Sequence, residues 1–310
     1  MSRSVLIGGG SGLIGTRLTE ILLQKGYHVR HLGRTSKEHS VAGKTVTTFG
    51  WDIHGGTMDE RAFEGVDVVI NLAGANVNGH RWTKAYKKEI LESRTKSTRL
   101  IVNFLNNKRH QATNFILGSA IGYYGLANSQ HVFRETDAPG TDFMAQVVVE
   151  WEKAAHECKL RTAIIRTGIV LSEKGGAEQE MARPIKLYAG SPLGSGKQVV
   201  SWIHLEDICG IFFHVIENNL SGTFNGVAPA PATNEEITRA LAKKLHKPLI
   251  LPNVPAFVLK IVIGEMADAV LGGNTVSAEK IISAGYEFQH PTLQSALRES
   301  QITNSSAANN

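Results

Sequence analysis

The sequence predicts an α/β protein with a doubly wound parallel sheet, followed by a smaller C-terminal α/β lobe. Three observations lead to this fold class. The chain has 310 residues, more than one ordinary domain needs. Short apolar runs alternate with segments of helical period over residues 4–171, and a glycine cluster joins the first run to the first such segment. Strands that alternate with helices form a parallel sheet covered on both faces.

The first elements are read directly from periodicity. Residues 5–7 predict a strand, and Leu13, Leu18 and Leu22 follow at helical spacing until Gly26 ends the helix. The further elements expected in this part of the chain are strands at 27–32, 66–74, 115–117 and 162–165 and helices at 84–107 and 143–159.

The pattern changes after residue 171. Residues 172–198 are rich in glycine and contain proline, which predicts loops. The elements expected beyond them are strands at 202–204, 223–227 and 249–251 and helices at 205–215, 234–245, 254–271 and 291–299. We therefore expect one domain from 1–171 and 205–229, a second from 172–204 and 230–300, and a disordered polar tail at 301–310.

Composition excludes several classes of protein. The net charge is +5, from 33 Lys and Arg against 28 Asp and Glu, and the cations are interleaved with acids, so we expect no nucleic-acid partner. Two distant cysteines and 12 scattered histidines predict neither a disulfide framework nor a metal site. The sequence has neither a leader-like nor a membrane-spanning apolar segment, so we expect a cytoplasmic protein without a membrane partner.

The glycine cluster carries the strongest functional signal. Residues Gly9, Gly10, Ser11, Gly12, Leu13, Ile14 and Gly15 satisfy both the GxGxxG and the GxxGxxG spacing, between the first strand and the first helix. In that context the helix N-terminus binds a pyrophosphate and the glycines let the backbone approach it. This predicts a Rossmann-type dinucleotide site, against the alternative of a tight turn without a ligand.

The end of the second strand selects between the two nicotinamide cofactors. An NAD site places a carboxylate there to bind the ribose 2′-hydroxyl, but this strand ends Leu32-Gly33-Arg34. A guanidinium pairs with a 2′-phosphate instead. We therefore expect NADP(H) as the cofactor, with a solvated surface arginine as the alternative for Arg34.

Several motifs together resemble one protein family. They are the glycine turn, the turn at 71–74, the segment Ser119-Ala120-Ile121-Gly122-Tyr123-Tyr124-Gly125, and the segments 166–171, 202–207 and 224–229. The chain is similar in these places to the atypical extended short-chain dehydrogenases/reductases, and in particular to the epimerase-like family with a C-terminal domain of unknown function. The resemblance implies an NADP-binding Rossmann domain followed by a substrate-binding lobe.

The resemblance also implies further cofactor contacts. Asp52 matches an acid that meets the adenine, and Leu72, Ala73 and Gly74 would lie along the adenosine ribose. The segment at Gly168 would approach the nicotinamide carboxamide with its backbone.

The catalytic residues are the weakest part of the match. Hydride transfer in this superfamily uses Tyr-x-x-x-Lys, but Phe143 stands at the tyrosine place and Val147 at the lysine place. Alignment on Tyr124-Gly125 puts Ala120 where the usual serine falls. Ser119 and Tyr123 are the candidates for substitutes, and a packed aromatic is the alternative for Tyr123.

Two cations are candidates for binding a small anionic substrate. They are Arg94, on the helix after the 71–74 turn, and Lys197, in the glycine-rich region. A solvated face or a structural salt bridge is the alternative for Arg94. The function expected is an NADP(H)-binding oxidoreductase or epimerase-like activity on a small molecule, a nucleotide sugar or a carbonyl compound. A non-catalytic NADP(H) sensor acting on a protein partner is the alternative, and a homodimer is left open.

Overall fold

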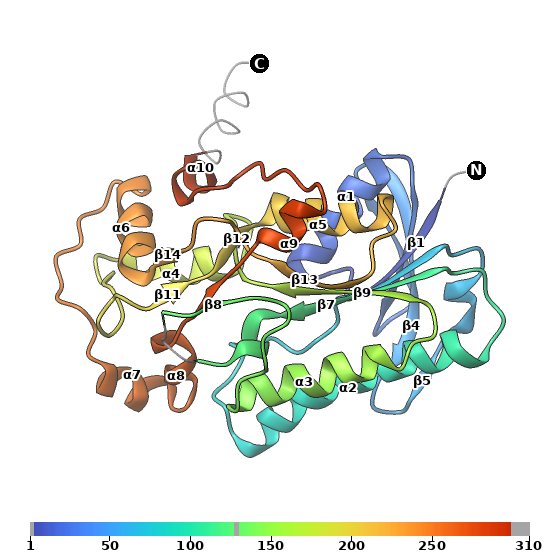
Figure 1. Ribbon diagram of the computed structural model, residues 1–310, viewed down its shortest axis with the longest axis horizontal. Helices are drawn as coiled ribbons and strands as arrows, with labels where there is room; N and C mark the ends of the chain where they lie inside the picture. Colours follow the sequence, from blue (N-terminus) through green and yellow to red (C-terminus); the bar gives the residue numbers. More distant parts are fainter. Residues whose placement is uncertain (1–2, 127–129, 299–310) are drawn as a thin grey trace, which may run out of the picture. The chain divides into compact units, whose positions relative to one another are not determined.

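The computed structural model describes residues 3–126 and 130–298 (Figure 1). They form two compact units. The first contains the described residues through Tyr123, with Thr141–Arg166 and Cys209–Phe224. The second contains Tyr124–Gly140, Thr167–Ile208 and the described residues from Asn225 onward. The functions expected of the two domains stay predictions, and the expected tail at 301–310 lies outside the described residues.

The first unit is built on a mainly parallel sheet. Its described strands run in the order β13-β9-β7-β6-β1-β2-β4-β3. Strand β1 pairs in parallel with β2 on one side and with β6 on the other, so the chain reverses its direction of winding at β1. This is the doubly wound Rossmann arrangement that the sequence predicts. The strands are β1 (Ser4–Gly8), β2 (His28–Gly33), β3 (Lys37–Val41), β4 (Lys44–Asp52), β6 (Val68–Asn71), β7 (Asn114–Ala120), β9 (Arg161–Thr167) and β13 (Gly222–Gly226).

Helices cover both faces of this sheet (Figure 1). On one face lie α2 (Lys84–Asn107) and α3 (Phe143–His156), which pack side by side. Their apolar residues Ile101, Phe104 and Trp151 join the strand residues Leu6 and Phe115 in one buried cluster. On the other face lie α1 (Leu13–Gln24) and the part of α5 (Leu205–Glu217) that belongs to this unit. Because β1 and β6 are buried throughout, both faces of the central strands exclude water.

The hairpin of β3 and β4 is not among the expected elements. Strand β4 pairs in parallel with β2, whereas β3 and the short β5 (Thr57–Met58) pair with β4 antiparallel. The residues of β3 are mostly exposed and polar, so no apolar run predicts them.

The second unit is a smaller α/β arrangement of short strand pairs. They are β10 (Ile169–Leu171) with β12 (Trp202–His204), β11 (Val199–Val200) with β14 (Ala232–Thr233), and β15 (Thr275–Val276) with β8 (Val132–Phe133). Helices α4 (Ala177–Lys186), α6 (Asn234–Lys244) and α10 (Leu293–Arg298) enclose a core that contains Trp202 and Leu241. Helix α6 begins with a capping box between Thr233 and Glu236.

Three expectations for the C-terminal part of the sequence are wrong. Helix α4 lies inside the region expected to be loop, because Ile185 and Ala182 find a buried face although Pro184 stands in the helix. The helix expected at 254–271 is two helices, α7 (Ala256–Ile263) and α8 (Met266–Leu271), because Gly264 has φ of 66°. Residues 249–251 form no strand, since no described strand pairs with them.

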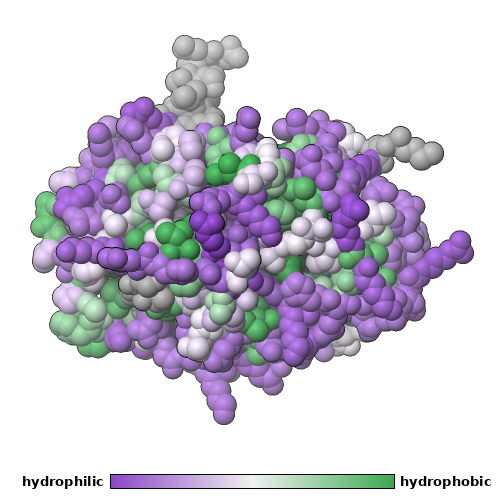
Figure 2. Space-filling view, in the orientation of Figure 1, coloured by the Kyte–Doolittle hydropathy of each residue, from purple (hydrophilic) through white to green (hydrophobic). Residues whose placement is uncertain are grey.

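Helix α7 presents apolar side chains to solvent. None of its residues is buried, and Phe257, Ile261 and Val262 are exposed. Figure 2 shows apolar residues at the surface where Figure 1 places this helix. Nothing described covers this face, and a homodimer stays a prediction. Among the described residues, none of the helices has the length and hydropathy required to cross a bilayer.

Asp207 fastens the first turn of α5 to the C-terminal segment of the second unit. Its fully buried carboxylate accepts hydrogen bonds from the Tyr286 hydroxyl (3.0 Å), from the backbone amides of Gln289 (2.7 Å) and His290 (2.9 Å), and from His290 Nδ1 (3.1 Å). Burial acts to raise the pKa of Asp207, but hydrogen bonds from His290, Gln289 and Tyr286 outweigh it and lower the pKa.

Replacing this carboxylate is therefore expected to destabilise the protein. In Asp207→Asn the new amide faces donors that it cannot satisfy, so we expect the free energy of unfolding to fall by about 2–4 kcal/mol in urea titrations. Asp268→Asn, an exposed acid on α8 paired with Lys260, is the control and should cost less than about 1 kcal/mol. Equal losses in the two variants would contradict the role assigned to Asp207.

Candidate functional site

The glycine turn between β1 and α1 is packed so closely that most of its glycines are required. Gly9 has φ of 80°, and a Cβ there would lie 2.9 Å from the backbone nitrogen of Ala73. A Cβ on Gly10 would lie 2.4 Å from the His31 ring, and one on Gly15 would lie 2.5 Å from the Gly9 carbonyl oxygen. These three positions exclude any side chain because the protein itself fills the space.

Gly12 is different, because the protein does not fill the space beside it. A Cβ there would meet only the Gly9 carbonyl oxygen, at 3.4 Å, and Ser11 and Gly12 are exposed. Gly12 caps α1 without a side-chain hydrogen bond, and the first turn of α1 contains no acid. The first amide groups of a helix lack intrahelical acceptors, so this terminus suits an anion such as a pyrophosphate. The turn therefore fits a dinucleotide.

His31, which the sequence analysis did not assign, supports the turn from β2. Its buried ring lies against Gly10, and Nε2 is 2.9 Å from Thr19 Oγ1. Since that hydroxyl donates to the Gly15 carbonyl, it accepts from His31, which places the proton on Nε2. Burial, assisted by the charge of His39, lowers the pKa of His31 to about 4. The one indication of this role in the sequence was the polar residue His31 itself, which stands between Val29 and Gly33 on the face of the strand that points into the protein.

The second turn, at 72–74, is held by Asn71 at the end of β6. The buried Asn71 amide donates to Thr98 Oγ1 (2.9 Å) and Ser97 Oγ (3.3 Å), and its Oδ1 accepts from the Ala73 amide (3.1 Å). The Leu72 amide donates to the Gly8 carbonyl (2.8 Å). Leu72, Ala73 and Gly74 are thus placed next to the glycine turn, where the resemblance puts a cofactor; that they contact one stays a prediction.

The two residues expected near the adenosine differ in their surroundings. Arg34 is exposed directly after β2, and the described residues give it neither a hydrogen bond nor an ion pair. Asp52 ends β4, and its Oδ1 accepts the backbone amides of His54 (3.0 Å) and Gly55 (2.9 Å). Arg34 is therefore available for a phosphate, whereas one Asp52 oxygen already closes a turn. Both cofactor contacts stay predictions.

The two catalytic candidates belong to a buried network that sequence reasoning missed. The Ser119 hydroxyl donates to Glu152 Oε1 (2.6 Å), and Arg166 binds both oxygens of Glu152, at 2.9 and 2.8 Å. The Arg166 guanidinium lies 3.3 Å from the centre of the Tyr123 ring. Arg166 and Glu152 are almost completely buried, so their charges compensate each other. The feature of the sequence that could have indicated this network is the charged residue Arg166 at the end of an apolar strand.

The positions of the missing tyrosine-lysine pair are packed by other residues. Phe143, in the first turn of α3, makes an edge contact with Trp82 at 5.3 Å, and the Lys87 amine lies 4.9 Å from its ring centre. Val147 is buried. Neither Phe143 nor Val147 carries an exchangeable side-chain proton, so neither can take the proton-transfer role of the tyrosine-lysine pair.

Arg94 lies directly behind the 72–74 turn. A Cβ on Gly74 would be 2.9 Å from Arg94 Cζ, and the guanidinium lies 5.2 Å from the Trp151 ring centre. Its Nη1 donates to the Ile90 carbonyl at 3.0 Å. Burial lowers the pKa of Arg94 to about 10, so the group is still a cation at neutral pH.

The remaining predicted residues belong to the second unit. Gly168 donates its amide to the Gly226 carbonyl (2.9 Å), and a Cβ there would be 2.5 Å from the Ser201 carbonyl oxygen, so packing alone requires this glycine. Lys197 is exposed, and its amide donates to Ser195 Oγ (3.2 Å). Contacts of either residue with a cofactor or substrate stay predictions.

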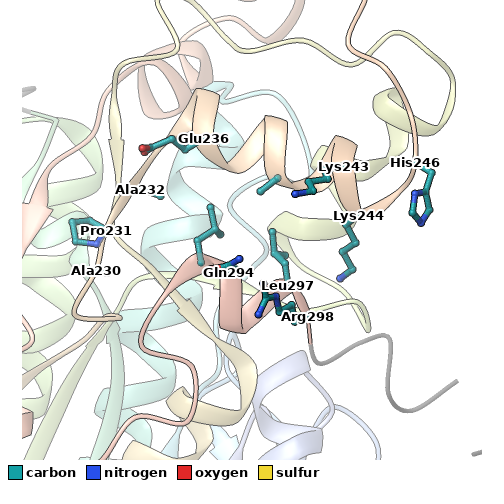
Figure 3. Close-up of a pocket in the computed structure, with 12 residues that line it drawn as sticks. Ala230, Pro231, Ala232, Glu236, Lys243, Lys244, His246, Gln294, Leu297 and Arg298 are labelled. Carbon is teal, nitrogen blue, oxygen red and sulfur yellow. The ribbon is translucent and has the colours of Figure 1, made fainter. Parts of the chain in front are cut away.

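The second unit also contains a hollow of about 710 Å³ between α6 and α10 (Figure 3). Its walls combine the apolar residues Leu293 and Leu297 with the cations Lys243, Lys244 and Arg298. Lys244 is paired with Glu173 and Glu178 at 2.7 and 2.6 Å. None of the residues predicted to bind cofactor or substrate lines this hollow.

One cluster has the composition of a metal site. His204, Asp207 and His290 bring their ligand atoms within 4.8 Å of one another. However, the two Asp207 oxygens accept four hydrogen bonds, which occupy the lone pairs that a metal ion would need. The cluster is therefore a structural lock, and His204 packs on His290 with ring centres 3.9 Å apart.

Comparisons with known proteins give matches along most of the sequence. The model of the NAD dependent epimerase/dehydratase family matches residues 5–226, and that of a domain of unknown function, DUF1731, matches residues 254–300. The chain is 34% identical over 301 residues to epimerase family protein SDR39U1 of Mus musculus, covering 95% of this chain and 98% of the relative. It is 33% identical over 300 residues to epimerase family protein YfhF of Bacillus subtilis, covering 96% and 97%.

Solved structures of two such proteins superpose on the chain. The crystal structure of human epimerase family protein SDR39U1 (isoform 2) with NADPH has a TM-score of 0.82 and 32% identity, covering 96% of this chain and 98% of that one. A nucleoside-diphosphate sugar epimerase from Corynebacterium glutamicum has a TM-score of 0.74 and 26% identity, covering 99% of this chain and 62% of that one. The fold is therefore that of the NAD(P)-binding epimerases.

The buried neutral His31 predicts a pH dependence of stability. Its pKa of about 4 in the folded state lies below the ordinary 6.5, so between these values the unfolded state binds more protons. The stabilisation is complete above pH 6.5 and is lost as the pH falls toward 4, by on the order of 3 kcal/mol. Urea unfolding at several pH values should show this loss in the native protein and a flatter profile in His31→Asn.

The exposed His54 provides the control for this measurement. His54→Asn should give a profile parallel to that of the native protein, because His54 is solvated. A native-like slope in His31→Asn would show that another group causes the acid sensitivity.

Proposed function

The chain belongs to the NAD dependent epimerase/dehydratase family. From this premise we propose that it binds NADP(H) at the glycine turn and transfers hydride from NADPH to a small carbonyl compound or, in reverse, from the alcohol to NADP⁺. The observation that carries the cofactor choice is Arg34. It follows β2 where an NAD site needs an acid, it is exposed, and the described residues offer it no partner. The human relative, whose structure contains NADPH, supports the same choice.

In this proposal, different residues of the chain bind different parts of the cofactor. The amides of Leu13 and Ile14 at the start of α1 bind the pyrophosphate, and Arg34 binds the 2′-phosphate. The turn at 72–74 lies along the ribose, with Asp52 near the adenine and Gly168 near the nicotinamide. When bound, NADPH supplies the hydride, and the protein supplies orientation and the proton.

Tyr123 is the proposed proton donor. The Ser119 hydroxyl donates its hydrogen bond to Glu152. Ser119 can therefore accept a hydrogen bond from a substrate but cannot donate one to it. The Tyr123 phenol carries an exchangeable proton on the same segment, and Arg166, fixed by Glu152, holds the face of its ring. Tyr123 then protonates the substrate's carbonyl oxygen as charge develops on it.

Reduction of a carbonyl or enone ranks above epimerisation of a nucleotide sugar. Transient oxidation of a sugar alcohol needs a base that removes the hydroxyl proton, and Phe143 stands where relatives of this type keep one. Reduction of an electrophilic carbonyl requires less acid–base catalysis from the protein than oxidation of an alcohol does. The substrate-side cations proposed here are Arg94 and Lys197.

The cofactor proposal is tested by calorimetric titration with NADPH and NADH. In Arg34→Ala we expect NADPH affinity to fall about 10- to 100-fold, the cost of one charge-assisted phosphate contact, while NADH affinity is unchanged. Arg61→Ala, an exposed arginine paired with Asp59, should leave both affinities unchanged. If neither nucleotide binds the native protein, the proposed function is wrong.

The role of Tyr123 is tested by NADPH consumption with a panel of quinones, aromatic aldehydes and nucleotide sugars. For any compound that is turned over, Tyr123→Phe should lower kcat by about 100-fold or more without changing the Kd for NADPH. Tyr188→Phe, an exposed tyrosine of the second unit, is the control. Unchanged turnover in Tyr123→Phe would exclude Tyr123 as the donor.

A further inference from the structure

Arg94 is a partly buried cation for which the described residues provide no counter-ion. Burial lowers its pKa, and its described hydrogen bond goes to a backbone carbonyl, that of Ile90. In the described part of the chain no carboxylate pairs with it. The acids nearest on the same helix are engaged elsewhere: Glu92 with Lys88 and Lys96, and Glu89 with His54.

The contrast with Arg166 makes this arrangement informative. Arg166 is more deeply buried than Arg94, and it binds both oxygens of Glu152, so the protein compensates its charge internally. An uncompensated buried charge destabilises the folded state, and the cost is recovered when an opposite charge arrives. The fold therefore maintains at Arg94 a partly desolvated cation that no carboxylate in the described part of the chain neutralises.

The guanidinium is open to such an anion at one place. Gly74 is exposed, and the space where its Cβ would stand is bounded by Arg94 Cζ at 2.9 Å and Nε at 3.2 Å. Arg94 Nε and Nη2 make no described hydrogen bond. They are also absent from the described buried atoms that lack a partner, so both retain contact with solvent. Because Gly74 has no side chain, the guanidinium packs directly against this exposed backbone position.

We propose that Arg94 binds an oxyanion of the substrate, a carboxylate or a phosphate ester, so that the substrate is a small anion. The planar fork of a guanidinium with Nε and Nη2 free matches the two oxygens of such a group. Trp151 supports the opposite side of the guanidinium, with 5.2 Å between Cζ and the ring centre. This proposal rests on the proposed function, because the 72–74 turn is the one along which the cofactor is proposed to lie.

Anion titrations on protein saturated with NADPH test the proposal. The probes are acetate and inorganic phosphate at constant ionic strength, with chloride as the reference salt. Trp151 reports occupancy because an anion on Arg94 changes the charge beside its ring, so we expect a saturable change of fluorescence and a rise in Tm. Trp151→Phe should remove the fluorescence change and keep the rise in Tm.

Variants separate binding at Arg94 from general effects of salt. In Arg94→Gln the anion affinity should fall by at least about tenfold while the Kd for NADPH stays within about twofold. Gly74→Ala should displace the guanidinium and weaken anion binding without removing the charge. Arg99→Gln, on the same helix and paired on the surface with Glu150, is the matched control and should bind anions normally.

The outcomes distinguish this proposal from the proposed function. If NADPH binds but neither anion gives a saturable change, or if Arg94→Gln responds like the native protein, the Arg94 site is wrong and the cofactor proposal stands. If Arg94→Gln weakens NADPH by tenfold or more, Arg94 belongs to the cofactor site and the substrate proposal is overturned. If NADPH does not bind at all, the same titrations on the free protein decide the Arg94 site separately, and Arg94→Lys serves should Arg94→Gln fail to fold.

Discussion

The close approach of two backbone turns is the constraint on which the first unit depends. The glycine turn after β1 and the turn after β6 touch so closely that Gly9 has no room for a side chain beside Ala73. Hydrogen bonds of Asn71 hold the second turn, and His31 supports the first. Neither turn can move away from the other without leaving buried polar groups unpaired. At the point where the sheet reverses its winding, this produces a rigid backbone surface with exposed amides.

The charges of the first unit differ in how they are compensated. The buried charge of Arg166 is compensated by Glu152, and surface charges such as those of Lys88 and Lys96 are paired loosely with Glu92. Arg94 differs from both, since it is partly buried and no described carboxylate pairs with it. A protein keeps such a cation at a cost in stability, which is reasonable where a ligand supplies the missing charge.

The loss of the tyrosine-lysine pair does not leave a gap in the structure. Phe143 is packed against Trp82 and Val147 is buried in the core, so α3 keeps its position without the groups that usually transfer the proton. The polar network instead joins Ser119, Tyr123 and Arg166, at the ends of β7 and β9, to Glu152 on α3. Helix α3 thus keeps a carboxylate in this network although it lacks both groups of the tyrosine-lysine pair.

The sequence by itself determined the parallel sheet, the glycine turn and the polarity at the end of β2, because each depends on residues close together in the chain. The period of the apolar residues predicts the sheet, the spacing of the glycines predicts the turn, and the residue after the strand sets the polarity. Tertiary structure alone decided which charges meet. Glu152 and Arg166 are 14 residues apart and belong to different elements, so only the packing of α3 against the sheet brings them together. It also decided that 249–251 finds no partner strand and that α7 keeps an exposed apolar face, because pairing and burial depend on neighbours distant in the chain.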